Sequence, residues 1–141
     1  MTREEILALV DRRRAAWEAR DAAALAATHA DKGIAVSPTG GVLEGRAEIE
    51  RVYRLWFSAF TNLRFRDEEI LIDGDRVALV ATLSGTHAGD FFGLAPTGRQ
   101  VDVQVALLMK VADGLVVEER RIYDFTGVLV QVGVLKAKPV A

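Results

Sequence analysis

Charged side chains that could do chemistry are concentrated in one strand-like run near the C-terminus, residues 113–127. The run opens with an Asp-Gly turn dipeptide and a short β-branched segment, which together predict the start of a strand. Four consecutive charges follow at 118–121, and Asp124 ends the apolar pattern that resumes after them. A strand with a carboxylate and a guanidinium on each face must border solvent or a polar cavity.

Strand alternation divides this run into two sets of side chains, because successive residues point to opposite faces. One face carries Glu118, Arg120, Ile122 and Asp124, and the other carries Glu119, Arg121 and Tyr123. We interpret the face that ends in Asp124 as the one turned toward a cavity. Glu119 and Arg121 are then expected on the outer or subunit-facing side.

Asp124 and Arg120 each have an ordinary and a functional interpretation. Asp124 at a strand end is well placed to cap a following helix, which is the usual role of aspartate there. In an apolar cavity the same carboxylate could act as a general acid and base. Arg120 could bind a substrate carboxylate, but a structural ion pair with Glu118 or a helix acid is favoured, since buried charges are normally paired.

The two histidines of the chain are further candidates. His87 lies between Gly85 and Gly89 and could polarise a carbonyl in a cavity, or it could be purely structural. His29 follows an alanine-rich segment and is expected to interact with the dipole at its C-terminal end. Asp90 is either a loop cap or a ligand contact. No close-spaced ligand triad predicts a metal site, and no glycine-rich phosphate motif is present, so we expect neither a metal nor a nucleotide cofactor.

Composition limits the class of protein. The chain of 141 residues has the length of one domain, and we expect residues 1–141 to form one. The net charge of −2 gives no electrostatic basis for binding nucleic acid or an anionic membrane. Cysteine is absent, which excludes disulfides and thiolate chemistry. Because no signal peptide or membrane span is recognisable, we expect a soluble cytoplasmic protein.

Two helices are expected before the first strand. A capping-box pattern at Thr2 and Glu5 starts the first, which runs to about residue 19. One of its faces carries Ile6, Val10, Arg13 and Trp17 at helical spacing. Asp21 is a suitable N-cap for a second, short helix over residues 22–28.

A third helix, from residue 46 onward, has the clearest periodicity in the chain. Its apolar positions recur at i, i+3, i+4, i+7, i+8 and i+11 and comprise Ile49, Val52, Tyr53, Trp56, Phe57 and Phe60. Such a stripe ordinarily packs on a sheet, and its aromatic residues can also form the wall of a ligand pocket. Trp17, Tyr53, Trp56, Phe57 and Phe91 are therefore the candidate aromatic residues of a pocket.

Strands dominate the rest of the chain. We expect a short hairpin at 34–44 and four long strands at about 63–72, 76–87, 101–111 and 115–124, joined mostly by tight turns. The tail at 125–135 fits a strand or a helix equally well. Helices followed by a curved, mostly antiparallel sheet predict an α+β domain in which three N-terminal helices pack on the sheet and enclose a pocket.

Residues 85–99, GTHAGDFFGLAPTGR, resemble the GTHxG(E/D)FxGxxPTG(K/R) segment of the SnoaL-like polyketide cyclases, also called the ester cyclase family. The resemblance continues through residues 118–124 and into the Gly127–Gly133 tail. Upstream it includes Asp21, the Gly45-Arg46 pair and residues 60–63. The fold that it implies is the nuclear transport factor 2-like α+β cone.

The resemblance also implies a function. Polyketide cyclases of this family close a ring by an intramolecular aldol reaction without a cofactor, and their acid/base aspartate corresponds here to Asp124. His87 would line the same cavity, and the ligand would be an apolar, carbonyl-bearing small molecule. A non-catalytic binding module and a limonene-type epoxide hydrolase, which needs an Asp–Arg–Asp array, remain alternatives on this fold. A homodimer is expected by the same analogy, with residues 63–72 and 115–124 as candidate interfaces.

Overall fold

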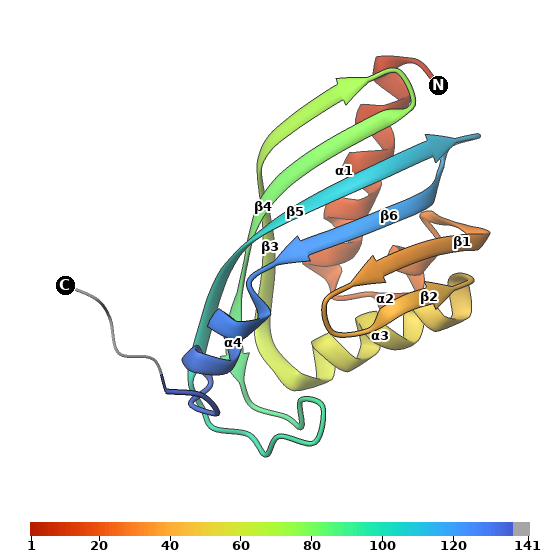
Figure 1. Cartoon of the computed structure of the whole chain (residues 1–141). Helices are drawn as coiled ribbons and strands as arrows, with labels where there is room; N and C mark the ends of the chain where they lie inside the picture. Colours follow the sequence, from red (N-terminus) through yellow and green to blue (C-terminus); the bar gives the residue numbers. More distant parts are fainter. Residues whose placement is uncertain (137–141) are drawn as a thin grey trace.

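The computed structural model describes residues 1–136. In this range the helices of the N-terminal half lie on the inner side of one curved sheet, and the C-terminal helix lies beside the end of that sheet, after the last strand (Figure 1). Their bounds are α1 Arg3–Ala19, α2 Ala22–Ala26, α3 Arg46–Ala59 and α4 Phe125–Gln131. The capping box of α1 is confirmed, because the Thr2 hydroxyl accepts from the Glu5 amide and the Glu5 carboxylate accepts from the Thr2 amide. The ambiguous tail resolves as the helix α4.

Within residues 1–136 the sheet has six strands in the order β2-β1-β6-β5-β4-β3. Their bounds are β1 His29–Ser37, β2 Gly41–Glu44, β3 Phe60–Asp73, β4 Arg76–His87, β5 Gln100–Ala112 and β6 Leu115–Tyr123. The pairings are antiparallel except for β1, which runs parallel to β6. The predicted mostly antiparallel α+β architecture is confirmed, and β1 is longer than expected because it begins at His29.

The core lies between the concave face of the sheet and helices α1 and α3. The apolar stripe of α3 is buried as predicted, with Ile49, Val52, Tyr53 and Trp56 all less than a tenth exposed. Phe60, which continued the helical pattern in the sequence, instead begins β3 and is fully buried there. The inward residues of β5 alternate along the strand at 101, 103, 105, 107 and 109.

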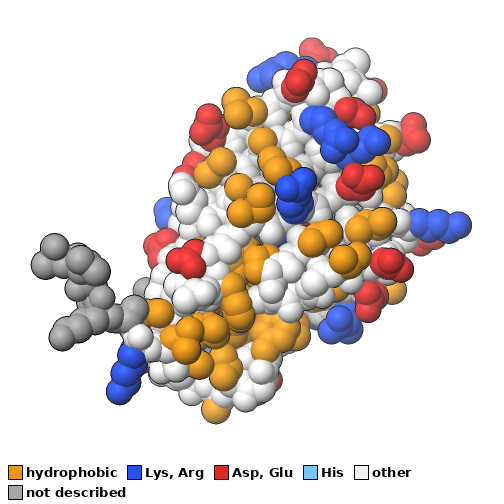
Figure 2. Space-filling view, viewed as in Figure 1, with side chains coloured by type: hydrophobic (Ala, Val, Ile, Leu, Met, Phe, Trp, Pro, Cys, Tyr) orange, Lys and Arg blue, Asp and Glu red, His pale blue; other side chains and the backbone are white. Residues whose placement is uncertain are grey.

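The convex face of the sheet is turned to solvent. Strands β4 to β6 pass in front of α1 in Figure 1, so the same view in Figure 2 looks onto this outer face. Hydrophobic side chains are scattered there between isolated charged ones. They include Ile34, Val36, Leu71, Leu108 and Ile122, each between 39% and 61% exposed.

The sequence predicts one domain and no membrane-spanning helix. The predicted domain spans residues 1–141, of which 137–141 lie outside the described residues. Within the described part, the helices are too short or too polar to cross a membrane.

Candidate active site

The inner face of β6 is the opposite of the one expected from its sequence. Glu119 is 2% exposed and Arg121 points into the concave side, whereas Glu118 and Arg120 are exposed to solvent. The assignment of Glu118 and Arg120 to the cone was therefore wrong. Its physical reason is that each face of the strand carries one acid and one arginine, so alternation alone cannot tell which face is buried.

A buried charge cluster joins this face of β6 to α1. One oxygen of Glu119 accepts from Nη2 of Arg13 at 2.8 Å, and the other accepts from Nε of Arg121 at 2.7 Å. The side chains of Glu119, Arg13 and Arg121 are 0%, 4% and 10% exposed. Both carboxylate oxygens are thus neutralised by arginine, which is the usual condition for burying such charges.

His29 and Tyr53 complete the cluster. Nη1 of Arg13 lies 3.2 Å from Nε2 of His29, and the Tyr53 hydroxyl lies 2.8 Å from the same nitrogen. Because arginine can only donate, a hydrogen bond from Arg13 makes Nε2 the acceptor and places the ring proton on Nδ1, which is buried without a partner among the described residues. His29 therefore serves as a fixed acceptor inside the core, at the start of β1, and the expected role at a helix C-terminus was wrong.

Burial and charge together set the protonation of this cluster. Burial, reinforced by Arg13, Arg121 and Arg46 and only partly opposed by Glu119, lowers the pKa of His29 to about 3. Burial alone would raise the pKa of Glu119, but Arg13, Arg121 and His29 together lower it to about 2. Near neutral pH the cluster therefore contains a neutral histidine and an ionised carboxylate.

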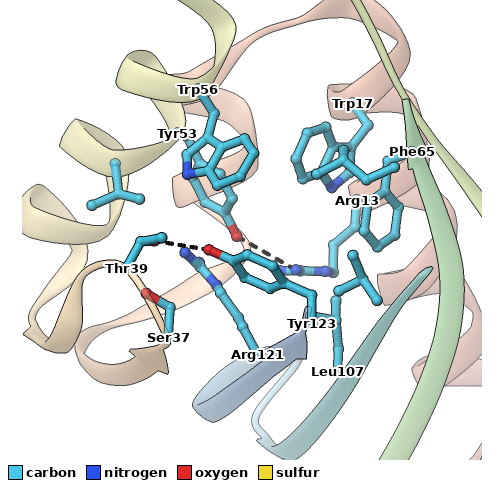
Figure 3. A pocket seen from close by; sticks show the side chains of 13 residues that line it. Arg13, Trp17, Ser37, Thr39, Tyr53, Trp56, Phe65, Leu107, Arg121 and Tyr123 are labelled. Carbon is cyan, nitrogen blue, oxygen red and sulfur yellow. Dashed lines mark hydrogen bonds between the residues drawn. The ribbon is translucent and has the colours of Figure 1, made fainter. Parts of the chain in front are cut away.

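Above this cluster the sheet and the helices enclose a pocket (Figure 3). The space that the centres of water molecules can occupy in it is about 50 Å³, room for a few waters. Its lining is mostly apolar and aromatic and comprises Arg13, Trp17, Ser37, Thr39, Val52, Tyr53, Trp56, Phe65, Leu83, Val105, Leu107, Arg121 and Tyr123. Among these residues the polar groups are hydroxyls, arginines and the tryptophan N–H.

Aromatic contacts hold the pocket walls in place. Trp17 stacks on Phe65 with ring centroids 4.8 Å apart and meets Tyr53 edge-on at 5.8 Å. Trp56 meets Tyr123 edge-on, also at 5.8 Å. The Tyr123 hydroxyl shares a 2.8 Å hydrogen bond with Thr39, and burial raises the pKa of Tyr123, so this phenol stays protonated at neutral pH. The aromatic side chains of the walls are therefore held in place by one another and are uncharged.

Asp124 does not line this pocket. Its side chain is exposed, and it accepts a 2.9 Å hydrogen bond from the Gly127 amide as the N-cap of α4. Gly127 suits this cap because a Cβ there would overlap the Asp124 carboxylate. Arg120 pairs in register with Val36 and Leu108 on the outer face. The Asp–Arg–Asp array of an epoxide hydrolase, which would need Arg120 beside Asp124, is not assembled inside the cone.

The remaining sequence candidates lie beside the pocket. His87 is fully buried against Phe60 and Phe91, and its Nδ1 is 3.0 Å from the Thr97 hydroxyl. Phe91 packs edge-on against Trp56, and Phe57 packs behind Trp17. Asp90 is exposed and caps its own loop by accepting from the Gly93 amide. The structure brings Trp17, Tyr53 and Trp56 into the lining and leaves the other predicted residues outside it.

Sequence reasoning missed Arg13, Arg121 and Tyr123 as pocket residues. The signal for Arg13 was present, because it interrupts the apolar helical face that also carries Trp17. An arginine on such a face predicts a buried acid opposite it. No cluster of three or more His, Cys, Asp or Glu side chains in residues 1–136 is arranged to hold a metal ion.

Comparisons with known proteins agree with this architecture. The model of the SnoaL-like polyketide cyclase family matches residues 8–132. Nogalonic acid methyl ester cyclase from Streptomyces nogalater is 34% identical over 80 residues, which cover 55% of this chain and 60% of that protein. The match thus spans less than two thirds of that relative's length.

Solved structures give the same result over a larger part of the chain. AclR from Streptomyces galilaeus, for which a hydroxylase activity has been suggested, is 28% identical with a TM-score of 0.84, over 98% of this chain and 91% of AclR. A Catenulispora acidiphila protein with a ketosteroid isomerase-like fold is 22% identical with a TM-score of 0.78, over 90% of this chain and 93% of that one. An NTF2-like protein from Burkholderia thailandensis is 26% identical with a TM-score of 0.72, over 85% of this chain and 91% of that one, so the fold is the nuclear transport factor 2-like α+β cone.

Proposed function

Because the chain belongs to the SnoaL-like polyketide cyclase family, we propose that it is a cofactor-independent enzyme of the cyclase or isomerase type. Its substrate is an apolar, carbonyl-bearing small molecule bound in the pocket of Figure 3. The observation that carries this proposal is the pocket itself, with aromatic walls and a few convergent donors at one end. The family match and the cyclase among the relatives support the reaction class.

The donors suit the demands of an aldol closure. Removal of a proton beside a carbonyl places negative charge on the carbonyl oxygen, and attack of the resulting enolate on a second carbonyl creates an alkoxide. Fixed cations and hydroxyls stabilise such oxygens best where water is excluded. Arg121 and the hydroxyls of Tyr53 and Tyr123 line the pocket and are the groups for this role.

An aldol closure also needs a base to remove the proton beside the carbonyl. Aspartate, glutamate and histidine are absent from the lining residues, and Glu119 beneath them is held by two arginines. The acid/base role predicted for Asp124 requires its carboxylate to leave the Gly127 amide and turn past Tyr123 into the pocket. If Asp124 makes this rearrangement, the pocket has a catalytic base. If it does not, the alternative function applies, which is a non-catalytic module that binds a small molecule.

Asp124→Asn tests the choice directly. Asparagine caps a helix about as well as aspartate, so the variant keeps the fold and changes only the ability to move a proton. Turnover and affinity are measured on a panel of polyketide-like and steroid-like carbonyl compounds, with Asp90→Asn as the matched exposed-aspartate control. Catalysis by Asp124 predicts a loss of about 100-fold or more in kcat with affinity retained. Unchanged kcat assigns Asp124 to capping alone, and binding without turnover by the wild type favours the binding module.

We propose that this protein forms a homodimer in which the outer faces of the two sheets pack against each other. Val36, Leu108 and Ile122 are 39%, 39% and 46% exposed there and lie on the adjacent strands β1, β5 and β6. Ile122→Asp is expected to shift the protein to the monomer in light scattering. Phe92→Asp is the control, because Phe92 is 44% exposed in a loop and has a positive φ that aspartate tolerates. A wild-type monomer at micromolar concentration would contradict the proposal.

A further inference from the structure

The guanidinium of Arg121 presents an unused donor to the pocket. Its Nε is held by Glu119 at 2.7 Å, and its carbon lies 4.8 Å from the centroid of the Tyr53 ring. Its Nη2 is buried and has no hydrogen-bond partner among the described residues. A buried polar atom without a partner is costly, and native structures contain few of them.

A second unused donor lies in the same pocket. Nε1 of Trp17 is buried and also lacks a partner among residues 1–136. Its ring is fixed by the stack on Phe65, so the N–H direction is fixed as well. Both oxygens of Glu119 are already occupied by arginines. A ligand that accepts hydrogen bonds would therefore satisfy both donors.

The charges of the cluster do not balance without such a ligand. Arg13 and Arg121 contribute two positive charges, Glu119 contributes one negative charge, and His29 is neutral because burial keeps its pKa near 3. One positive charge is thus in excess, on side chains at least nine-tenths buried. An anion that binds to Arg121 would neutralise it, which a neutral ligand cannot do.

We propose that the substrate of this pocket is a planar, ring-bearing monoanion whose carboxylate or enolate oxygens are bound by Nη2 of Arg121 and Nε1 of Trp17. The inference rests on the proposed function in one respect, namely that this pocket is the substrate site, and it adds one anionic group to the apolar, carbonyl-bearing body proposed there. The apolar body of the ligand packs against the aromatic walls and Leu107 (Figure 3). Arg121 and Trp17 are in this view the residues that select an anion over its neutral analogue.

Calorimetric titration with matched ligand pairs tests this selection. The probes are benzoate and 2-naphthoate, each with its neutral methyl ester, and an acidic hydroxynaphthoquinone with its neutral methyl ether. Tighter binding of all three acids than of their neutral partners supports the proposal. Preference for an arylcarboxylate alone or the hydroxyquinone alone identifies the anion as a carboxylate or an enolate. Equal binding within every acid–neutral pair that binds, or no acid binding at all, overturns it.

Variants link the preference to the two donors. Arg121→Met keeps the aliphatic stem and leaves Glu119 paired with Arg13, so we expect the acids to bind about 10- to 100-fold more weakly and the esters to change less than threefold. Trp17→Phe keeps the stacked ring and is expected to weaken acid binding by about threefold to tenfold. Arg51→Met removes an arginine that is 61% exposed on α3 and is the matched control, expected to bind like the wild type.

Two experimental outcomes distinguish the proposed anion selectivity from the proposed enzymatic function. Acid binding that depends on Arg121, in a protein without turnover, retains the inference and rejects the enzyme. Turnover of neutral compounds that Arg121→Met leaves unchanged retains the enzyme, with the two tyrosine hydroxyls alone as its oxyanion donors, and overturns the inference. If Arg121→Met does not fold, Arg121→Lys replaces it, since lysine keeps the charge without the planar fork. Retained preference for acids with affinity reduced severalfold then supports the role of Arg121, and unaltered acid affinity contradicts it.

Discussion

The two faces of β6 carry the same kinds of side chain and have opposite fates. On the inner face Glu119 binds two arginines and Arg121 stacks on Tyr53, whereas Glu118 and Arg120 on the outer face lie in solvent. The difference comes from the neighbours, because α1 brings Arg13 to the inner face while the outer face meets only adjacent strands. The acid and the arginine on the inner face form part of a binding site because helix α1 adds a further charge there and excludes water.

The sharpest test of this contrast exchanges glutamate for glutamine on each face. Glu119→Gln leaves Arg13 and Arg121 buried without their counter-charge, and we expect it to lower the free energy of unfolding by about 3–5 kcal/mol. Glu118→Gln removes an exposed acid and is expected to cost less than about 0.5 kcal/mol. Urea unfolding of both variants measures the difference. Equal losses would mean that the inner cluster adds nothing to stability.

Acidification should weaken the inner cluster of His29 and Glu119. The pKa of His29 is lowered to about 3 and that of Glu119 to about 2 in the folded protein, against 6.5 and 4.5 as ordinary values. For both groups the unfolded chain binds the proton first, so stability is complete above pH 6.5 and is lost as the pH falls. The slope due to His29 is about 1.4 kcal/mol per pH unit between pH 6.5 and 3.

A histidine substitution isolates that slope. His29→Gln keeps a side-chain oxygen that can accept from Arg13 and removes the titrating ring. We expect the stability of this variant to stay flat from pH 6.5 to about 4.5 and then to fall, because below that pH the Glu119 carboxylate is protonated in the unfolded chain but not yet in the folded one. Unfolding free energies at fixed ionic strength across this range provide the measurement. A variant that loses stability as steeply as the wild type near pH 6 would contradict the assignment.

The sequence predicts the features of this fold that arise from patterns within one segment, and it does not predict those that depend on contacts between distant segments. The stripe of α3, the capping box of α1 and the strand alternation of β5 are local periodicities, and each occurs as expected. The parallel pairing of β1 with β6 joins segments some 85 residues apart, as in Val36 with Arg120, and no local pattern reports it. The choice of the inner face of β6 depends on that pairing and on α1, so it could be read only from the fold.

The candidate site follows the same rule. Tyr53 and Trp56 lie on the strongly periodic helix α3 and Trp17 lies on the apolar face of α1, and the sequence indicated all three as pocket residues. Arg121 and Tyr123 lie on a strand whose two faces are chemically equivalent, and the sequence assigned them to the wrong side. Asp124 could not be assigned from the sequence for a different reason, because aspartate suits both a helix cap and a catalytic base. In the structure it is the helix cap.

Asp124 at the end of β6 permits a test of moderate size. Asp124→Ala removes the acceptor for the Gly127 amide, and we expect a loss of about 1 kcal/mol in stability. Asp124→Asn retains a capping oxygen and should lose only a few tenths of that. Thermal and urea unfolding of the pair measure the cap independently of any activity. Equal stability of all three proteins would remove the cap as the reason for aspartate at this position.

The smallest expected effect belongs to Arg120, the outer counterpart of Arg121. It is exposed between Val36 and Leu108 and has no contact with the pocket lining, so Arg120→Gln should change the affinity for any pocket ligand by less than about twofold. The measurement is the same titration of 2-naphthoate that is used for Arg121→Met, carried out at one protein concentration so that the oligomeric state is constant. A loss as large as that of the inner arginine would mean that the ligand lies on the outer face. The adjacent arginines would then have exchanged the roles that burial assigns to them.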